Sequence, residues 1–399
     1  MYTSQIHIMK KLIILLLCFI PLMELSAQKA EAVYSFALVK KSTSWYHEQI
    51  VAWKKVIDTN PKDGKAWYNY YYANRNALRT DPKTAQDPVA HKAKMDKVME
   101  AMGKAIPDAY EYHVCMWMDH GNDFAYHHHL EKAIEMGEGR WEHLDFVINE
   151  GEISRDLKMR NEACLARKKE GLVSPGMMYY NHNVLTGLKP NAILLTAGDN
   201  DTYPAWTLQA MGFREDVKVI NLSLILVDDY RERIYKELGI KNFTTLDWDS
   251  KDETSPKHLR YLQKTIIETM ATNTKGFPVY VGNTAMGAPH IVDSVKNELY
   301  LTGLAYLYCE ESVDERALLK KNFEQNYALD YIEYAYFDDL SEGLVPIMNQ
   351  NYIVPMLKLY DHYKLAGDLT KMAWMRDYII QVSKGNPSEK AILEHLNMN

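Results

Sequence analysis

One short segment, residues 191–204, restricts the folds open to this chain more than any other. An apolar run that starts at Ala192 ends at Gly198, polar residues fill positions 199–202, and Pro204 opens an amphipathic stretch. This succession predicts a buried strand, a tight loop and a helix that begins at Pro204. In α/β units, ligands bind to the loops at the carboxyl ends of strands. We therefore expect a ligand-binding site formed by Asp199, Asn200, Asp201 and Thr202.

Neighbouring apolar runs extend this segment into a small α/β domain. Ile193–Leu195 and Val217–Ile220 flank the expected helix Pro204–Met211, and together they predict a β-α-β unit. Phe277–Val281 predicts a further strand, and alternation of strands with helices indicates a mostly parallel sheet. A second polar loop follows Val281 and would lie at the same edge of the sheet as the first. Asn283 in that loop therefore joins the expected ligand-binding residues.

Helical periodicity dominates on both sides of this domain. Between Ser44 and Leu188, a first amphipathic run stops at Asn60-Pro61 and an aromatic-rich run follows Gly64. That pattern is typical of tetratricopeptide-like helix-turn-helix repeats. We expect further helices at about 87–104, 109–118, 123–136, 140–153, 155–169, 229–238, 256–272, 352–365 and 369–382. The predicted fold class is α/β plus all-α, with tetratricopeptide-like helical-repeat segments flanking a small, mostly parallel α/β domain.

The first residues have the pattern of a secretory signal peptide. A basic stretch at Met9–Lys11 precedes an apolar core from Leu12 to Leu22, and Leu25-Ser-Ala27 gives a small-residue cleavage site before Gln28. We therefore expect export to the periplasm or the extracellular space. The expected organisation is a signal peptide at 1–27, a helical-repeat domain at 28–188, the α/β domain at 189–312 and C-terminal helical repeats at 313–399.

Charge and cysteine content narrow the classes of partner and cofactor. The net charge is −7, with basic and acidic residues mixed, so there is no basic footprint for nucleic acid. No apolar stretch after the signal peptide is long enough to span a membrane. Cys115, Cys164 and Cys309 allow one disulfide, do not form a disulfide framework and lack metal-ligand spacing. We therefore expect no nucleic acid partner, no membrane-spanning segment, no metal ion and no cofactor.

A set of short motifs runs through the central and C-terminal parts of the chain: Gly198-Asp-Asn-Asp-Thr-Tyr-Pro204, Trp206, Leu208-Gln209, Arg214, Asp216-Val217, Asn221-Leu-Ser-Leu224, Phe277-Pro-Val-Tyr280, Leu301-Thr-Gly-Leu-Ala-Tyr306 and Asn326-Tyr327. Together they resemble the soluble C-terminal region of a family of multi-spanning bacterial membrane proteins, which is grouped with the protein O-mannosyltransferases and carries tetratricopeptide-like repeats after its membrane part. The resemblance implies a fold and a cell-envelope context. The family's glycosyl transfer belongs to the membrane part, in whose place this chain has a signal peptide and helices, so the resemblance does not imply transferase activity.

The 198–204 loop allows several interpretations. In the structural one, Pro204 takes the first helical position and Asp201 or Thr202 caps the helix, which leaves Asp199 and Asn200 unexplained. In a second, the two aspartates bind a metal or a sugar. A third, an Asp-x-Asp element for a nucleotide sugar, conflicts with export. An aspartate phosphotransferase needs its hydroxyl one position later than Thr202, and an EF-hand is excluded because its twelfth position would be Ala210.

Other polar clusters carry weaker signals. His127–His129 cannot converge on one metal ion because successive helical residues point about 100° apart, so we expect a solvated helix face. Tyr179–Asn183 lies on a helix that should pack on the sheet, from where Asn183 would reach the 199–202 loop. Arg214 and Asp216 are expected in a surface turn. Asp228 is a further polar group that would serve catalysis if it converged with the loop.

Two classes of function remain open at this level. The first is an exported, non-catalytic envelope protein whose helical repeats bind a protein or glycan partner. The second is an enzyme, either glycan-active or metal-dependent, that uses Asp199 and Asp201 as acid/base or metal-holding groups. We favour binding over catalysis, because the common hydrolase, metalloprotease and phosphate-loop motifs are absent from the sequence.

Overall fold

The computed structural model describes residues 29–85, 87–121, 123–240, 265–266, 268–287, 298–334 and 338–396. These residues form two compact units. The first takes in the described residues up to Ser35 together with Lys41–Met136, and the second takes in Phe36–Lys40 together with the described residues from Gly137 onward. The expected signal peptide, its cleavage site and most of the expected helix 256–272 lie outside the described residues.

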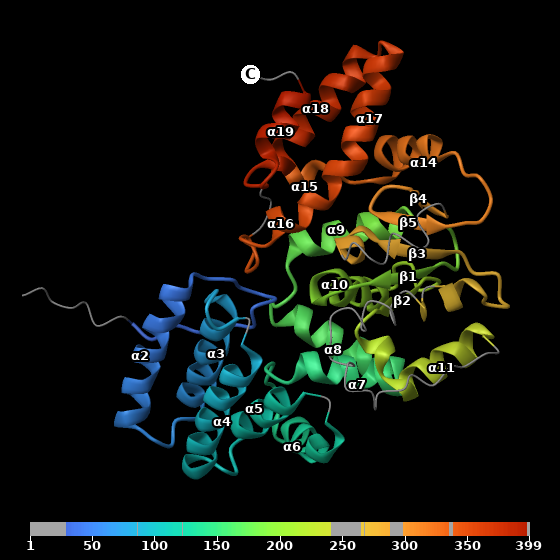
Figure 1. The fold of residues 1–399 in the computed structure, drawn as a ribbon. Coiled ribbons are helices and arrows are strands. Elements are labelled where there is room, and N and C mark those ends of the chain that lie inside the picture. The colour runs from blue at the N-terminus through green and yellow to red at the C-terminus, as the bar shows by residue number, and fades with distance from the viewer. Residues whose placement is uncertain are drawn as a thin grey trace, which may run out of the picture. The chain divides into compact units, whose positions relative to one another are not determined.

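The first unit is helical throughout. Its helices are α2 (Thr43–Thr59), α3 (Gly64–Thr80), α4 (Pro88–Ala105), α5 (Tyr110–His120) and α6 (His127–Met136), with a 3-10 turn η1 (Phe124–Tyr126) before the last (Figure 1). Helix α2 packs against α3, and their aromatic residues Tyr46, Trp53, Trp67 and Tyr71 are buried. The expected helix-turn-helix at Asn60-Pro61 is confirmed. The tetratricopeptide type of the repeat stays a prediction.

Short polar side chains begin these helices. The side chains of Ser42, Asp63 and Asp87 each accept a hydrogen bond from the backbone N–H three residues later, at 3.2, 2.9 and 2.9 Å. Such caps satisfy amides that have no partner in the first helical turn. The turn between α2 and α3 is also anchored, because the Trp67 indole donates to the Pro61 carbonyl at 3.0 Å. Local sequence alone therefore places these helix ends.

The second unit combines helices with a five-stranded sheet. The strands are β1 (Ile193–Thr196), β2 (Lys218–Asn221), β3 (Val279–Gly282), β4 (Leu299–Leu301) and β5 (Ala305–Tyr308), in the order β2-β1-β3-β5-β4. The helices are α7 (Leu144–Ser154), α8 (Leu157–Lys169), α9 (Pro175–Thr186), α10 (Asp199–Ala210), α11 (Asp228–Leu238), α14 (Glu315–Lys321), α15 (Asp330–Glu333), α16 (Val345–Asn349), α17 (Ile353–Ala366), α18 (Leu369–Ser383) and α19 (Glu389–His395). Short helical turns are η2 (Leu224–Leu226), η3 (Asn283–Gly287), η4 (Asn322–Asn326) and η5 (Gln350–Tyr352). This mixture of helices with a small α/β sheet confirms the broad fold class.

The sheet is mixed, which corrects the expectation of a mostly parallel one. Strand β1 pairs in parallel with β2 and β3, as the β-α-β pattern predicts. Strand β5 pairs antiparallel with β3 and with β4. Only a few residues connect β4 to β5, and so short a connection can join only antiparallel strands. The sequence pattern missed this hairpin because strands of three and four residues are too short to show a period of two.

The two faces of the sheet are covered by different helices. Leu194, Val219 and Tyr280 belong to a core cluster that includes residues of α8–α10 and of the C-terminal helices. Ile193 and Val281 point to the opposite face, into a cluster that includes residues of α11. Figure 1 shows the strands in the middle of this unit, with α9 and α10 beside them. Burial on both faces explains the continuous apolar runs of β1 and β3.

Side chains cover the outer edges of the sheet. Along β2, the Trp206 indole donates to the Val219 carbonyl at 3.1 Å and the Gln209 amide donates to the Val217 carbonyl at 2.6 Å. Along β4, the Leu301 N–H donates to the Glu315 carboxylate at 2.9 Å. Unpaired edge groups otherwise invite pairing with another chain. Among the residues that the structure describes, side chains rather than further strands make these contacts with the outer strands.

Two further findings concern the whole described part of the chain. None of its helices combines the length and the apolar character that crossing a bilayer requires. The three described cysteines, Cys115, Cys164 and Cys309, are not joined by disulfide bonds.

Candidate functional site at the carboxyl edge of the sheet

Helix α10 begins at Asp199, five residues before the predicted start at Pro204. Gly198 is the N-cap residue, and Asp201 in the third helical position reaches back to it. One oxygen of the Asp201 carboxylate accepts from the Gly198 N–H at 2.7 Å and the other accepts from the Ala197 N–H at 2.9 Å. A carboxylate at this position satisfies amides that the helix cannot. The prediction therefore identified the capping group but misplaced the helix start.

Pro204 lies inside α10, where proline normally disrupts a helix because it has no N–H to donate. The carbonyl left without this donor belongs to Asn200, four residues earlier. The side-chain amide of Asn181 on α9 donates to that carbonyl at 2.9 Å. The Tyr179–Asn183 segment thus reaches the loop through Asn181, whose amide replaces the missing helical hydrogen bond.

Asp201 also joins the two polar loops. Its carboxylate accepts a hydrogen bond from the Thr284 hydroxyl, which belongs to η3 directly after β3. The Asp201 residue is only 5% exposed. Burial raises the pKa of Asp201 above its ordinary value, although the bonds from Ala197, Thr284 and Gly198 act in the opposite direction. The two loops do share one edge of the sheet, as parallel pairing of β1 and β3 requires.

Thr202 ties the ends of two strands to the helix. Its hydroxyl lies 2.7 Å from the Thr196 hydroxyl at the end of β1 and accepts from the Asn221 amide, 3.0 Å away, at the end of β2. Thr202 is fully buried. Asp201 and Thr202 therefore face the interior and hold the loop in place.

Asp199 and Asn200 differ from these two residues in exposure. Asp199 is exposed in the first position of α10, where the helix dipole favours a negative charge. Asn200 is half-buried, and its side-chain amide donates to the Ala37 carbonyl at 3.0 Å. Asp199 is thus the carboxylate of this loop that a ligand in solution can reach.

The structure does not bring Asn183 to the loop. Asn183 is fully buried, and its side chain exchanges two hydrogen bonds with the backbone of Ala328, at 2.8 and 2.9 Å. Its amide also lies 2.8 Å from the Tyr352 hydroxyl. Asn183 therefore holds the segment after η4 in place. Asn181, two residues earlier on the helix, takes the position at the loop.

Asn283 has a mixed environment. Its amide donates to the carbonyls of Gly303 and Asn351, at 3.0 and 3.2 Å. Its side-chain oxygen is buried and has no hydrogen-bond partner within the described part of the chain. Its neighbour Thr284, which the sequence did not single out, makes the contact with Asp201.

The other polar residues quoted from the sequence have structural contacts. The Arg214 guanidinium binds the carbonyls of Leu185, Leu188 and Lys189 at the end of α9. It also forms an ion pair with Asp216, whose carboxylate holds the Asn191 N–H. Asp228 forms an ion pair with Arg231, which is buried. These residues fix turns and helix ends and do not converge on the 199–202 loop.

The histidine triplet is not uniformly solvated, which corrects that expectation. His128 is exposed, whereas His129 is 8% exposed and its Nδ1 lies 2.6 Å from Nδ1 of the buried His113. Burial, with His128 and His113 nearby, lowers the pKa of His129 to about 4. The His128 and His129 rings lie next to each other, with 4.2 Å between their centroids. Within the described residues, no group of three or more His, Cys, Asp or Glu side chains is placed to hold a metal ion.

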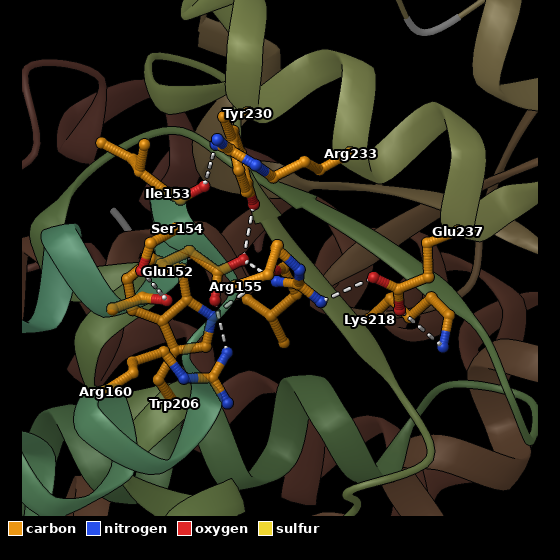
Figure 2. Close-up of polar contacts among 12 residues, drawn as sticks. Glu152, Ile153, Ser154, Arg155, Arg160, Trp206, Lys218, Tyr230, Arg233 and Glu237 are labelled. Atoms are coloured by element: carbon orange, nitrogen blue, oxygen red, sulfur yellow. Dashed lines mark hydrogen bonds and ion pairs between the residues drawn. The ribbon is translucent and has the colours of Figure 1, made fainter.

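A buried charge network that the sequence did not reveal lies between α7, α8 and α11. Glu152 is fully buried and binds Arg155 and Arg160, with 2.5 and 2.6 Å between the charged atoms. The Tyr230 hydroxyl donates to the same carboxylate at 2.6 Å. Arg155 also forms an ion pair with Glu237, and the Arg160 guanidinium lies over the Trp206 ring (Figure 2). Glycine at position 151 allows α8 to approach, since a Cβ there would lie 2.6 Å from the Arg160 backbone nitrogen.

This network borders a cavity of about 140 Å³ beside β2. The cavity is lined by Arg155, Leu157, Arg160, Asn161, Gln209, Glu215, Val217, Lys218, Val219, Ile220, Ile234 and Glu237. Two arginines and a lysine line the cavity together with two glutamates, and the buried Glu152 supplies a third carboxylate by binding both arginines. The arrangement joins helices from distant parts of the chain through paired charges.

A family model matches part of the chain. No curated protein and no solved structure matches the chain. The family model matches over a region that runs from α9 through β1, α10, β2 and α11 and includes the 198–204 loop. Its name refers to TMEM260, a protein O-mannosyltransferase-like family, which is in keeping with the resemblance noted from the sequence. Residues 178–252 of this chain are similar to that family, TMEM260-associated domain 2.

Proposed function

We propose that this protein is an exported, non-catalytic binding protein of the cell envelope. Its helices, arranged as tetratricopeptide-like hairpins, would present the surface for a protein or glycan partner. The main support comes from the burial and the hydrogen bonds of residues in the 198–204 loop. Asp201, one of the two carboxylates that the enzymatic alternative requires, is buried and bound to the neighbouring backbone, and Thr202 beside it is buried and bound as well.

On this proposal the loop divides its residues between two roles. Asp201, Thr202 and the Asn200 carbonyl hold the strand end and the helix start together. Asp199 is exposed at the same edge and would contact a ligand hydroxyl or amine. A single accessible carboxylate suits recognition better than acid/base chemistry, which normally requires a second positioned group.

An exposed apolar tip on the C-terminal helices supports a protein partner. Leu365 and Leu369, on either side of the turn between α17 and α18, are 90% and 68% exposed. The same end of α17 borders a hollow of about 720 Å³ between α14 and α17. Apolar side chains this exposed, close together in the sequence at a helix turn, are candidates for contact with a protein partner. Helical hairpins commonly bind partners through such surfaces.

Cross-linking in the intact cell envelope tests this proposal. The double variant Leu365→Glu, Leu369→Glu should lose cross-linked protein partners, because two charges replace the apolar tip. Val354→Glu is the matched control, since Val354 is 52% exposed near the other end of α17. Asp199→Asn should lower binding to purified envelope glycan fragments if the loop recognises a glycan. The proposal is wrong if neither variant changes the binding of any envelope protein or glycan.

The envelope location has its own test. The Leu25-Ser-Ala27 site predicts that the mature protein begins at or near Gln28. N-terminal sequencing of the protein from the periplasmic or extracellular fraction measures this directly. Recovery of the native protein with its first residues intact, in the cytoplasm, would contradict export.

The enzymatic alternative rests on one observation. Burial raises the pKa of Asp201, and perturbed carboxyl groups beside an exposed one are found at catalytic sites. A glycan-active or metal-dependent enzyme would release product from envelope glycans and would lose this activity in Asp199→Asn and Asp201→Asn alike. The binding proposal expects no product from the wild type, with or without added divalent metal.

A further inference from the structure

The first unit contains a cavity whose lining residues have no part in the 198–204 loop or in the proposed function. It measures about 370 Å³ and lies where α3, α4 and α5 meet. Its lining consists of Arg75, Arg79, Ala85, His91, Lys92, Met95, Met118 and Asp119. The volume falls within the range of pockets that hold small molecules.

Positive charge gathers in this cavity. Arg75 and Arg79 are one turn apart on α3 and therefore lie on the same side of the helix. Lys92 adds a third cation from α4, and Asp119 is the single carboxylate among the lining residues. The chain as a whole carries a net charge of −7. A local excess of cations in an acidic protein is a specific feature of this site.

Arg75 is the central group. It is half-buried, and no hydrogen bond or ion pair to its guanidinium is formed within the described part of the chain. Asp119, the nearest balancing charge in the cavity, accepts a hydrogen bond from the Tyr71 hydroxyl at 3.3 Å. Lys92 forms its ion pair with Asp96, four residues along α4. The Arg75 guanidinium therefore keeps its N–H donors available. Their planar, forked arrangement fits the oxygens of a carboxylate or a phosphate group.

His91 lines the same cavity, and the direction of its pKa shift indicates the sign of the charge around it. Burial lowers the pKa of His91, and the charges of Arg75, Arg79 and Lys94 lower it further, while Asp119 opposes them. The cavity therefore disfavours another positive charge and favours a negative one. Met95 and Met118 supply flexible apolar contacts beside the cations.

We infer that this cavity binds a small organic anion, a carboxylate or a phosphate carried on a short apolar body. Arg75 and Arg79 bind the anionic group, and Met95 and Met118 pack against the apolar body. The inference goes beyond the proposed function, because it involves neither the 198–204 loop nor the tip of α17 and α18. Either can fail without the other.

Calorimetric titration of the full chain with matched probes tests the ligand class. Hexanoate and hexyl phosphate should bind with dissociation constants of about 1 mM or lower. Acetate and inorganic phosphate should bind more weakly, because they lack the apolar body. Tighter binding of hexanoate assigns the site to carboxylates, and tighter binding of hexyl phosphate assigns it to phosphates. Equal binding of the neutral probe hexanol, or no binding of either hexyl anion, would overturn the inference.

Variants locate the binding. Arg75→Gln should weaken the tighter probe about ten- to hundredfold, the usual effect of losing a hydrogen bond to a charged group. Arg79→Gln should act in the same direction. Lys104→Gln is the matched control: it removes one positive charge from the same α4 helix, where Lys104 pairs with the exposed Glu100 outside the cavity. An equal loss in the control would mean that net charge alone attracts the anion, and the site assignment would be wrong.

The wild-type protein provides a readout that needs no variant. A bound anion would offset the charges of Arg75, Arg79 and Lys94, so the pKa of His91 should rise when the probe is added. Nuclear magnetic resonance titration of the His91 ring, with and without the probe, measures this shift. Lys92 and Asp119 face the same cavity and are present in both titrations. Binding of the probe without any rise in the pKa of His91 would place the ligand elsewhere.

Discussion

At the scale of single residues, the two aspartates of the loop illustrate what position does to one side-chain type. Asp201 accepts hydrogen bonds from two backbone amides and a hydroxyl, whereas Asp199 stands in solvent two residues away. The sequence suggested this division, because capping left Asp199 unexplained. It could not supply the contacts, since Thr284 is 83 residues from Asp201 along the chain.

Substitution of the two aspartates should separate their roles. Asp201→Ala should lower the free energy of unfolding by about 1–3 kcal/mol, because buried donors lose their acceptor. Asp199→Ala should lower it by less than about 1 kcal/mol, the usual effect of a charge at a helix N-terminus. Urea unfolding of the two variants beside the wild type measures both values. Equal losses would mean that Asp199 is as structural as Asp201.

Asn181 and Asn183 show where residue-level prediction from sequence ends. Both belong to the segment expected near the loop, and the prediction chose Asn183. Two residues along a helix differ by about 200° in direction, so only one of them can face the loop. The phase of α9 decides which, and it is set by packing against the sheet and the C-terminal helices. That packing involves Tyr352, far away in the sequence.

At the scale of elements, prediction succeeded where the apolar pattern was clear, either as helical periodicity or as an uninterrupted apolar run. Helices α11, α17 and α18 begin within a residue of their expected starts, and strands β1, β2 and β3 lie where the apolar runs predicted them. Helix α10 begins early because Asn181 supplies the hydrogen bond that Pro204 cannot. Proline is expected at a helix start because it has no N–H to donate. That expectation misplaces the start of α10, because the side chain of Asn181 supplies the missing donor.

The Glu152 network should dominate the contact between α7, α8 and α11. Arg160→Met should lower the free energy of unfolding by about 3–5 kcal/mol, because it leaves a fully buried carboxylate short of a partner. Glu162→Gln on the same helix is the control. Its ion pair with Lys158 spans 3.9 Å between exposed side chains, so its loss should change stability by less than about 1 kcal/mol. A loss below about 1 kcal/mol in Arg160→Met would contradict the role given to this network.

At the scale of the whole molecule, the first unit should be sensitive to acid. The pKa of His129 is about 4 in the folded protein, below its ordinary value of 6.5, mainly because the ring is buried. Between these values the unfolded chain takes up a proton that the folded chain does not. The contribution of the neutral His129 ring to the free energy of unfolding is therefore fully present above pH 6.5, and it is lost as the pH drops toward 4.

Urea unfolding between pH 4 and pH 7, followed by hydrogen exchange in α5 and α6, measures this dependence. His128, His113, Lys132 and His120 surround the ring and disfavour its charged form. The variant His129→Leu should flatten the dependence, because it removes the titrating ring. An unchanged slope in the variant would show that other groups cause the loss.

The short segment Phe36–Lys40 is synthesised early but packs with residues that are synthesised much later. It is made early, between residues of the first unit, yet it belongs to the second. The Ala37 carbonyl receives the Asn200 amide, which is synthesised 163 residues later. A ribosome, which makes the chain from its N-terminus, therefore completes Phe36–Lys40 well before it makes the Asn200 amide that binds this segment. The second unit therefore completes this contact only after both the early segment Phe36–Lys40 and the start of α10 have been synthesised.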